Sequence, residues 1–251
     1  MTVTLITGAS SGIGRSLALR LGRRGDPVAL VARRAFQLNE VTAAVTASGG
    51  RALPLPCDVT DAAQMDAAVR AAEAHFGAVE RFVSCAGGGG RTRVDAFRAD
   101  EVAALLELNV VGLARGIEAV LPGMLERRAG HLVVLGSLAA SRGLPAAAAY
   151  GAAKAAVHTM TESLRVDLRE RGVDVTLIEP GPVRVRPQSK KSRFVSIGLE
   201  EATARMERAI DARKAYVAFP PLFAMANRLG ALLPPRIYDR LLAGRGRKRQ
   251  P

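Results

Sequence analysis

The chain has 251 residues, of which 49% are hydrophobic and 24% are charged, and it contains no Trp. This is the composition of a folded protein with an aliphatic core, and it argues against intrinsic disorder. Two cysteines, Cys57 and Cys85, are too few for a disulfide framework or a metal cluster, so we expect no metal and a reduced, cytoplasmic setting. The first residues lack the pattern of a signal peptide, and no apolar run predicts a membrane-spanning helix.

The positive charge is concentrated toward the carboxyl terminus. The net charge is +13, but residues 1–185 carry 21 Lys and Arg against 18 Asp and Glu, whereas residues 186–251 carry 15 against 5. Such an asymmetry bears on partners and surface potential rather than on the fold. Because no basic and aromatic stripe accompanies the charge, we do not expect nucleic acid as a partner.

Strand-like apolar runs alternate with helical patterns along the chain. Continuous apolar strands separated by amphipathic helices indicate a parallel sheet covered on both faces, and right-handed crossovers then give a single doubly wound Rossmann-type α/β fold of about seven strands. The predicted strands are residues 3–7, 28–32, 51–56, 81–84, 131–136, 173–178 and 215–219. The predicted helices include one that ends near Arg24 and others at residues 61–76, 100–125, 150–171 and about 200–214.

The chain is expected to form one domain with two parts. Residues 1–185 are the predicted nucleotide-binding and catalytic core, because no linker-like tract interrupts them. Residues 186–251 are the predicted extension of the same domain. They would supply a substrate loop within residues 184–198, a capping helix, a proline-interrupted apolar segment and a basic tail at residues 244–251.

A glycine-rich turn follows the first predicted strand and opens the first helix. Its sequence over residues 7–14 is Thr-Gly-Ala-Ser-Ser-Gly-Ile-Gly. Glycines there let the backbone turn sharply and let a pyrophosphate approach the amino end of a helix, where free N–H groups favour anions. The spacing differs from both the usual dinucleotide pattern and a Walker A loop, and taken alone the cluster is also consistent with a plain turn.

The end of the second predicted strand bears on the choice of cofactor. Folds of this kind that bind NAD usually place an acidic residue there, whereas arginine holds the 2′-phosphate of NADP. Here Ala32 occupies the position and Arg33 and Arg34 follow, so two guanidiniums can bind a phosphate. We therefore predict NADP(H). The alternative is that one arginine, Arg34 in particular, is an ordinary solvated side chain.

Four polar residues form a candidate catalytic set. Tyr150 and Lys154 are four residues apart at the start of a predicted helix, so they lie on one face, and a neighbouring ammonium favours the phenolate of a tyrosine. Ser137 follows the fifth predicted strand, where sheets of this kind bind ligands. Asn109 is a polar residue on the packed side of a helix. Each residue taken singly is also explained as a structural side chain.

Together these motifs resemble the short-chain dehydrogenase/reductase family over residues 2–185, and more loosely to the end of the chain. The joint occurrence of the motifs in family order is specific, although no single motif is. The resemblance implies an NADP(H)-dependent oxidoreductase that interconverts a carbonyl and a secondary alcohol. The matching pieces are the glycine turn, Asp58-Val59, Ala86-Gly87, Asn109, Ser137, Tyr150 with Lys154, and Pro180-Gly181.

The resemblance also implies a role for each residue. Tyr150 would be the general acid/base, and Ser137 would orient the substrate oxygen. Lys154 would bind the nicotinamide ribose and assist the tyrosine, while Asn109 would hold a water in a proton relay. Asp58 would contact the adenine. The implied cofactor-binding residues are Gly8, Ser10, Ser11, Gly12, Ile13, Gly14, Arg33, Arg34, Asp58, Val59, Ala86, Gly87, Asn109, Tyr150, Lys154, Pro180, Gly181 and Val183.

The chain departs from the family pattern at two positions. Cys85 stands where the family has the Asn of an Asn-Ala-Gly motif, so the amide that usually braces this region is missing. Val185 stands where the family commonly has a Thr that contacts the carboxamide of the nicotinamide. Neither change removes a member of the catalytic set.

The substrate and partners are left open. The loop residues Arg184, Arg186, Lys190, Lys191 and Arg193 either recognise an anionic or carrier-bound substrate or form a solvated basic loop. The apolar segment at residues 216–242 either lies on an anionic membrane surface or folds back over the pocket or a subunit interface. The family implies a homodimer or homotetramer built on the helices at residues 100–125 and 150–171. A catalytically silent NADP-sensing or surface-binding protein is the alternative function.

Overall fold

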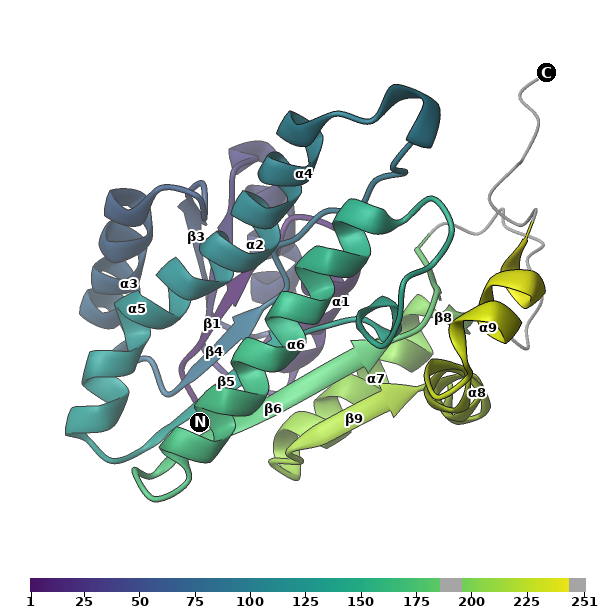
Figure 1. Cartoon of the computed structure of the whole chain (residues 1–251). Helices are drawn as coiled ribbons and strands as arrows, with labels where there is room; N and C mark the ends of the chain where they lie inside the picture. The colour runs from purple at the N-terminus through teal and green to yellow at the C-terminus, as the bar shows by residue number, and fades with distance from the viewer. Residues whose placement is uncertain (186–195, 244–251) are drawn as a thin grey trace.

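Seven parallel strands form the centre of the molecule (Figure 1). The computed structural model describes residues 1–185 and 196–243. The strand order is β3-β2-β1-β4-β5-β6-β9, so the chain winds outward in both directions from the boundary between β1 and β4. The predicted doubly wound Rossmann-type fold is confirmed. Its strands are β1 Thr4–Thr7, β2 Val28–Ala32, β3 Ala52–Pro56, β4 Arg81–Ser84, β5 Gly130–Leu135, β6 Val173–Pro180 and β9 Tyr216–Phe219.

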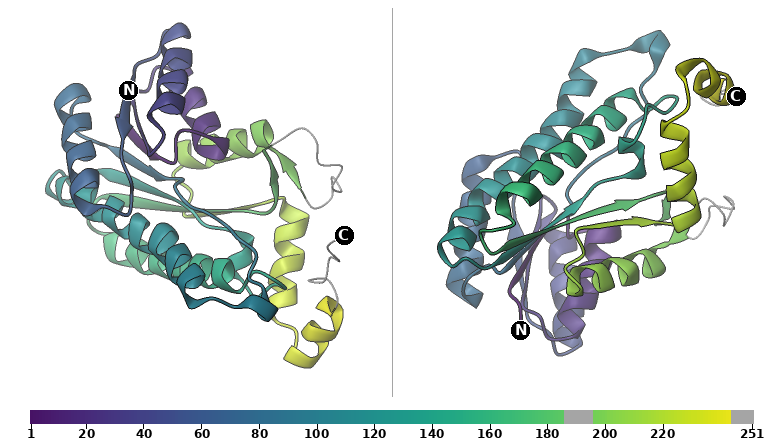
Figure 2. Two further views of the ribbon diagram at one scale, coloured as in Figure 1. Left: turned by 90° about the horizontal axis from the view of Figure 1, so that it is seen from above. Right: turned by 60° about the horizontal axis from the view of Figure 1, so that its bottom comes forward.

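Helices cover both faces of this sheet, as the two further views show (Figure 2). One apolar layer packs α3, α5 and α6 around Phe82, and the other packs α1, α2 and α7 around Leu30. Strands buried on both faces explain why their sequences are continuous apolar runs. The helices that flank the sheet are α1 Gly12–Arg23, α2 Ala35–Ala47, α3 Ala62–Phe76, α4 Ala99–Leu106, α5 Gly112–Glu126, α6 Ala148–Leu168 and α7 Leu199–Asp211.

The helix predicted at residues 100–125 is two α-helices joined by a π-helical turn. The turn covers Glu107–Val111 and lies between α4 and α5 without a break in the rod. An extra residue in such a turn rotates the following side chains, and π turns often lie at functional sites. Asn109 is the buried residue of this turn, and its side-chain amide donates to the Leu105 carbonyl at 2.9 Å. The sequence pattern does not distinguish this turn from a regular helix.

The segment at residues 184–198, expected as a surface loop, has paired ends. A short parallel pair joins β7 Val183–Arg184 to β8 Ile197–Gly198. Ile197 is buried in the same apolar layer that Val183 packs against, so hydrophobic contact holds the two ends together. Residues 186–195, which include Arg186, Lys190, Lys191 and Arg193, lie outside the described residues, as does the predicted basic tail at residues 244–251.

Two short helices follow the last strand, α8 Pro221–Ala231 and α9 Pro235–Leu242. Each begins at a proline, which is well suited to the first position of a helix because its fixed φ is helical and it needs no partner for an N–H. Both helices lie beyond the arrowheads of β6 and β9 (Figure 1). Within residues 1–185 and 196–243, no helix has both the length and the apolar character needed to cross a membrane.

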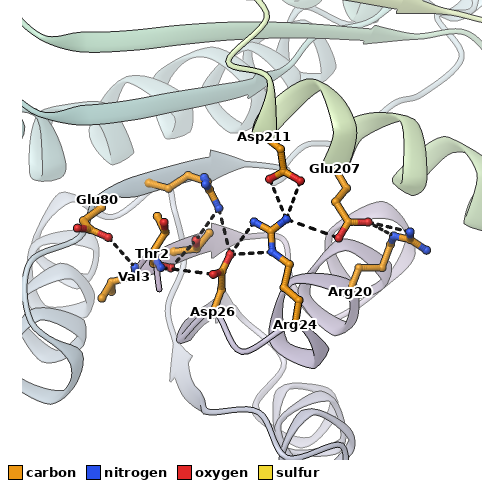
Figure 3. Close-up of polar contacts among 10 residues, drawn as sticks. Thr2, Val3, Arg20, Arg24, Asp26, Glu80, Glu207 and Asp211 are labelled. Carbon is orange, nitrogen blue, oxygen red and sulfur yellow. Dashed lines mark hydrogen bonds and ion pairs between the residues drawn. The ribbon is translucent and has the colours of Figure 1, made fainter.

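An ion-pair cluster ties the amino ends of the strands to α7 (Figure 3). Asp26, which is 7% exposed, accepts from the Thr2 N–H at 3.3 Å and lies 2.7 Å from Arg24 and 3.3 Å from buried Arg81. Arg24 also reaches Asp211 of α7 at 2.7 Å. The cluster therefore joins β1, β2, β4 and α7 at the edge of the sheet opposite the one where ligands bind in this fold.

Candidate active site

A cleft of about 850 Å³ opens at the carboxyl ends of the strands. The carboxyl edge is where open α/β sheets bind their ligands. Every residue that the sequence singled out for catalysis or cofactor binding lines this cleft, although their individual roles stay predictions. They are Gly8, Ser10, Ser11, Gly12, Ile13, Gly14, Arg33, Arg34, Asp58, Val59, Ala86, Gly87, Asn109, Ser137, Tyr150, Lys154, Pro180, Gly181 and Val183.

The glycine turn is built for close approach of the backbone. Gly8 has φ +69°, and a Cβ there would lie 2.8 Å from the backbone of Cys85 and Ala86. A Cβ on Gly14 would lie 2.4 Å from the Gly8 carbonyl oxygen, so only glycine allows the turn to close onto α1. The first residues of α1 receive no side-chain cap, and its first turn contains no acidic residue. Its free N–H groups therefore face the cleft as an anion site.

Arg33 and Arg34 lie beside this turn, at the end of β2. Arg34 donates to the Ser10 hydroxyl at 3.0 Å, so its guanidinium reaches across to the glycine turn. Arg33 is exposed and lies 3.7 Å from Asp58, the residue expected to contact the adenine. Hydrogen bonds from the Thr60 backbone and hydroxyl, with the nearby Arg33, lower the pKa of Asp58. This corner therefore presents two cations and one ionised carboxylate to the cleft.

Asn109 holds the backbone that follows β4. Its amide donates to the Gly88 carbonyl at 3.0 Å, while its Oδ1 is buried and has no hydrogen-bond partner among the described residues. A Cβ on Gly87 would lie 2.8 Å from that Oδ1 and 3.6 Å from the Lys154 ammonium, so Gly87 separates the two polar groups. A buried acceptor without a partner requires an explanation, and a ligand or water donor at the cleft supplies one.

The other three catalytic candidates come from β5 and α6. Ser137 follows β5, and its hydroxyl accepts from the Ala139 N–H at 3.2 Å. Tyr150 lies in the first turn of α6, and the Lys154 Nζ is 6.0 Å from the centre of its ring. Lys154 is 6% exposed and donates to the Leu135 carbonyl at 3.0 Å. Burial lowers the pKa of Lys154 to about 8, although the nearby Glu179 carboxylate acts in the opposite direction.

The two departures from the family pattern are accommodated in different ways. Burial raises the pKa of Cys85 to about 12, so this residue is a neutral thiol at neutral pH. The bracing expected from an amide at this position is made instead by Thr7, whose hydroxyl accepts from the Ala86 N–H at 3.1 Å, and by Asn109. Val185 lines the cleft as a half-exposed apolar side chain and offers no hydrogen bond there.

Part of the cleft wall was not predicted residue by residue. Phe223 and Asn227 of α8 line it, and Asn227 donates to the carbonyl of Leu138, which follows β5. Leu144 lines it as well. The expectation that the apolar carboxyl-terminal segment folds back over the pocket is therefore met by one face of α8. The spacing of four between Phe223 and Asn227 indicates that they share one face of a helix, and it is the sequence signal that could have found them.

A buried carboxylate packs against α6, the helix that carries Tyr150 and Lys154. Glu179 is 1% exposed, and its two oxygens hydrogen-bond His158 of α6 and the Tyr216 hydroxyl of β9, both at 2.8 Å. Glu179 points toward the same face of α6 as Lys154, since His158 and Lys154 are one turn apart. Burial and this hydrogen bond raise the pKa of Tyr216 to about 12. No sequence pattern singles out any of these three residues.

The residues present fit a nicotinamide dinucleotide. The uncapped amino end of α1 fits the pyrophosphate, and the glycine turn leaves room for it. The Asn109 Oδ1, which is buried and without a partner in the described part of the chain, and the Lys154 ammonium belong to the same cleft and offer an acceptor and a donor to the cofactor. The nicotinamide would be held by the backbone at residues 180–183, which lines the same cleft.

Known proteins match the chain in sequence and in fold. Residues 2–195 match the family model for short chain dehydrogenases. An oxidoreductase of Myxococcus xanthus (strain DK1622) is 40% identical over 237 residues, which cover 94% of each chain. A short-chain dehydrogenase from Streptomyces avermitilis has the same fold, with a TM-score of 0.80, 29% identity and 92% of each chain covered. A short-chain dehydrogenase/reductase from Serratia marcescens matches with a TM-score of 0.79 and 26% identity over 89% of this chain and 98% of that one. The chain thus belongs to the short-chain dehydrogenase/reductase family and is an oxidoreductase of that family.

Proposed function

We propose that the protein is an NADP(H)-dependent oxidoreductase that interconverts a carbonyl compound and a secondary alcohol. The observation that carries the proposal is that Asn109, Ser137, Tyr150 and Lys154 line the same cleft as an uncapped helix terminus and two arginines. Family membership supports a nicotinamide cofactor. The two cysteines are free thiols, consistent with the reduced cytoplasmic setting that we expect.

The side chains of the protein bind the substrate oxygen and transfer its proton. When bound, the cofactor supplies or accepts the hydride. In the reducing direction, the Ser137 hydroxyl donates a hydrogen bond to the carbonyl oxygen and Tyr150 gives that oxygen its proton. Lys154 supplies positive charge beside the phenolate that remains, and the Asn109 Oδ1 holds a donor that returns a proton from solvent. The reverse direction uses the same groups with the proton moving toward Tyr150.

Removing the Tyr150 hydroxyl tests the chemical role. For Tyr150→Phe we expect the rate of NADPH oxidation with a responsive ketone to fall by about 100-fold or more, since general acid catalysis is lost. NADPH affinity, measured by fluorescence titration, stays close to that of the wild type. Tyr238→Phe is the control, because its hydroxyl bonds the Gly143 carbonyl outside the catalytic set. Near-normal turnover in Tyr150→Phe would refute the assignment.

Tight NADPH binding by the wild type without turnover on ketones, 3-oxoacyl thioesters or aldehydes would favour the cofactor-sensing alternative.

The preference for NADP(H) rests on Arg33 and Arg34. The end of β2 has no carboxylate of the kind that binds the ribose of NAD, and the Arg34 guanidinium donates to the hydroxyl of Ser10 in the glycine turn. For Arg34→Ala we expect NADPH affinity to fall on the order of 10-fold while NADH affinity is unchanged, because a charge-assisted hydrogen bond to the 2′-phosphate is lost. Arg70→Ala, an exposed change on α3, is the control. Equal affinity of the wild type for NADPH and NADH would contradict the preference.

The substrate is a small carbonyl or alcohol compound, and the enzyme is a homodimer or homotetramer. Of the basic loop residues that could recognise an anionic or carrier-bound substrate, Arg184 is engaged internally: it donates to the Ser196 carbonyl and hydroxyl at 2.7 Å. Exposed Val166 and Ala152 on the outer side of α6 support a subunit contact there. Light scattering measures the assembly.

A further inference from the structure

Exposed apolar side chains gather on α8 and on the turn that follows it. Leu222, Met225, Leu229 and Leu232 are spaced three, four and three residues apart, which places them on one stripe of the helix. All four are exposed, Leu222 at 69% and Leu232 at 81%. The opposite side of the same helix contributes Phe223 and Asn227 to the cleft. A helix of this kind has one face in use within the fold and another without a partner among the described residues.

The next helix adds a row of cations beside a row of apolar residues. On α9, Ile237 and Leu241 are exposed and four residues apart, and Arg236 and Arg240 precede each of them directly. Neither arginine has a carboxylate partner within residues 1–185 and 196–243, although Asp239 lies between them in sequence. No residue of α9 is buried, so this helix is not held by packing in the hydrophobic core. Parallel apolar and basic rows are the pattern of helices that lie in a lipid interface.

We propose that α8 and α9 form a docking surface for an anionic membrane. The positive charge of these helices favours an anionic membrane over a second copy of the chain as the occupant of this surface. Residues 221–243, which contain both helices, carry three Arg and one acidic residue. A two-fold interface through this patch would bring the Arg236 and Arg240 of two copies together, whereas anionic lipid headgroups neutralise them. The exposed leucines then enter the boundary between headgroups and acyl chains.

The two faces of α8 connect this surface with the cleft. Since Phe223 lines the cleft and Leu222 lies at the docking surface, α8 forms the border between the cleft and the lipid when the protein is bound. A substrate that dissolves in the bilayer can then enter without crossing water. This consequence rests on the proposed function, and it assigns the substrate to the apolar carbonyl compounds that partition into membranes.

Sedimentation with vesicles tests the surface without cofactor or substrate. The full chain is mixed with vesicles of phosphatidylcholine, or of phosphatidylcholine and phosphatidylglycerol in equal parts. We expect binding to the anionic vesicles and much less to the neutral ones. The double variant Leu229→Gln with Leu232→Gln, and the double variant Arg236→Gln with Arg240→Gln, should each bind on the order of 10-fold more weakly. Phe36→Gln, an equally exposed apolar change on α2, should bind as the wild type does.

Circular dichroism shows that each variant is folded, and light scattering without vesicles identifies the other occupant. Absence of wild-type binding, or equal binding by all variants, overturns the proposal. An oligomer that the leucine variant dissociates also overturns it, because the patch is then a subunit interface.

A long-chain ketone in vesicles and a short ketone in solution test the substrate class. The leucine variant should lose rate with the first only. If neither ketone is reduced while vesicle binding stands, the proposed function fails and the membrane surface remains.

Discussion

Lys154 carries its proton where the surrounding protein disfavours it. The side chain is nearly fully buried, and its pKa is lowered to about 8 from the value of about 10.4 expected in the unfolded chain. At neutral pH the folded protein therefore holds a charge that the unfolded chain holds more readily, which destabilises the fold by about 3 kcal/mol. That destabilisation is present below pH 8 and disappears as the pH rises toward 10.4. The proposed function gives this charge a use, because it lies beside Tyr150.

Replacing Lys154 separates stability from activity. For Lys154→Met without cofactor we expect the free energy of unfolding near pH 7 to rise by about 2 kcal/mol, because the buried charge is gone and only one hydrogen bond, to Leu135, is lost. Turnover should be lost together with the positive charge. Urea unfolding measures the first effect and NADPH oxidation the second. A variant less stable than the wild type at neutral pH would show that burial of the ammonium is not destabilising.

The elements of this fold are joined at the amino end of the sheet by polar contacts as well as by the core. Asp26 precedes β2 and holds Arg81 at the start of β4, while Arg24 extends the cluster to α7 (Figure 3). Arg81 is only 6% exposed, so it relies on this carboxylate for its charge. Three elements that are distant in sequence thus depend on one side chain.

Neutralising that carboxylate should loosen all three elements. For Asp26→Asn we expect the free energy of unfolding to fall by about 3 kcal/mol, because a buried guanidinium is left without its counter-ion. Asp66→Asn is the matched control: its pair with Arg70 is exposed and 3.9 Å long, and its loss should change stability by less than about 0.5 kcal/mol. Equal urea midpoints for the two variants would contradict the role given to Asp26.

At the scale of the whole molecule, one histidine makes the fold sensitive to acid. His131 on β5 is 2% exposed, hydrogen-bonds Thr176 at 2.8 Å and lies opposite Arg81 in the strand register. Burial, together with the nearby Arg81, lowers its pKa to about 4. The unfolded chain takes up this proton at about pH 6.5. Stability that is complete above pH 6.5 is therefore lost as the pH falls toward 4, by about 3 kcal/mol in all.

Removing the imidazole should flatten that dependence. Urea unfolding of the wild type and of His131→Gln, which keeps a polar group near Thr176, is compared at about pH 7 and about pH 5. The wild type should lose more stability between the two than the variant does. His75→Gln, an exposed change at the end of α3, should follow the wild type. Parallel losses in all three proteins would exclude His131 as the source.

The strands, the glycine turn and the catalytic and cofactor-binding candidates in the cleft follow from local sequence patterns. Strands buried on both faces must be apolar throughout, and a glycine turn between strand and helix has few other uses, so local pattern was sufficient. Tyr150 and Lys154 were placed by helical spacing alone. These features depend on neighbours in the chain.

Which side chains meet across the fold depends on how the whole chain packs. The hydrogen bonds of Asn109 to Gly88, of Glu179 to α6 and β9, and of Asn227 to Leu138 all join residues whose separation in sequence carries no periodic signal. The same holds for the apolar segment after β9. Its sequence shows that it is amphipathic, but which face packs and which face stays open depends on where the cleft lies. Contacts between distant segments follow from packing of the complete chain, and local propensity does not encode them.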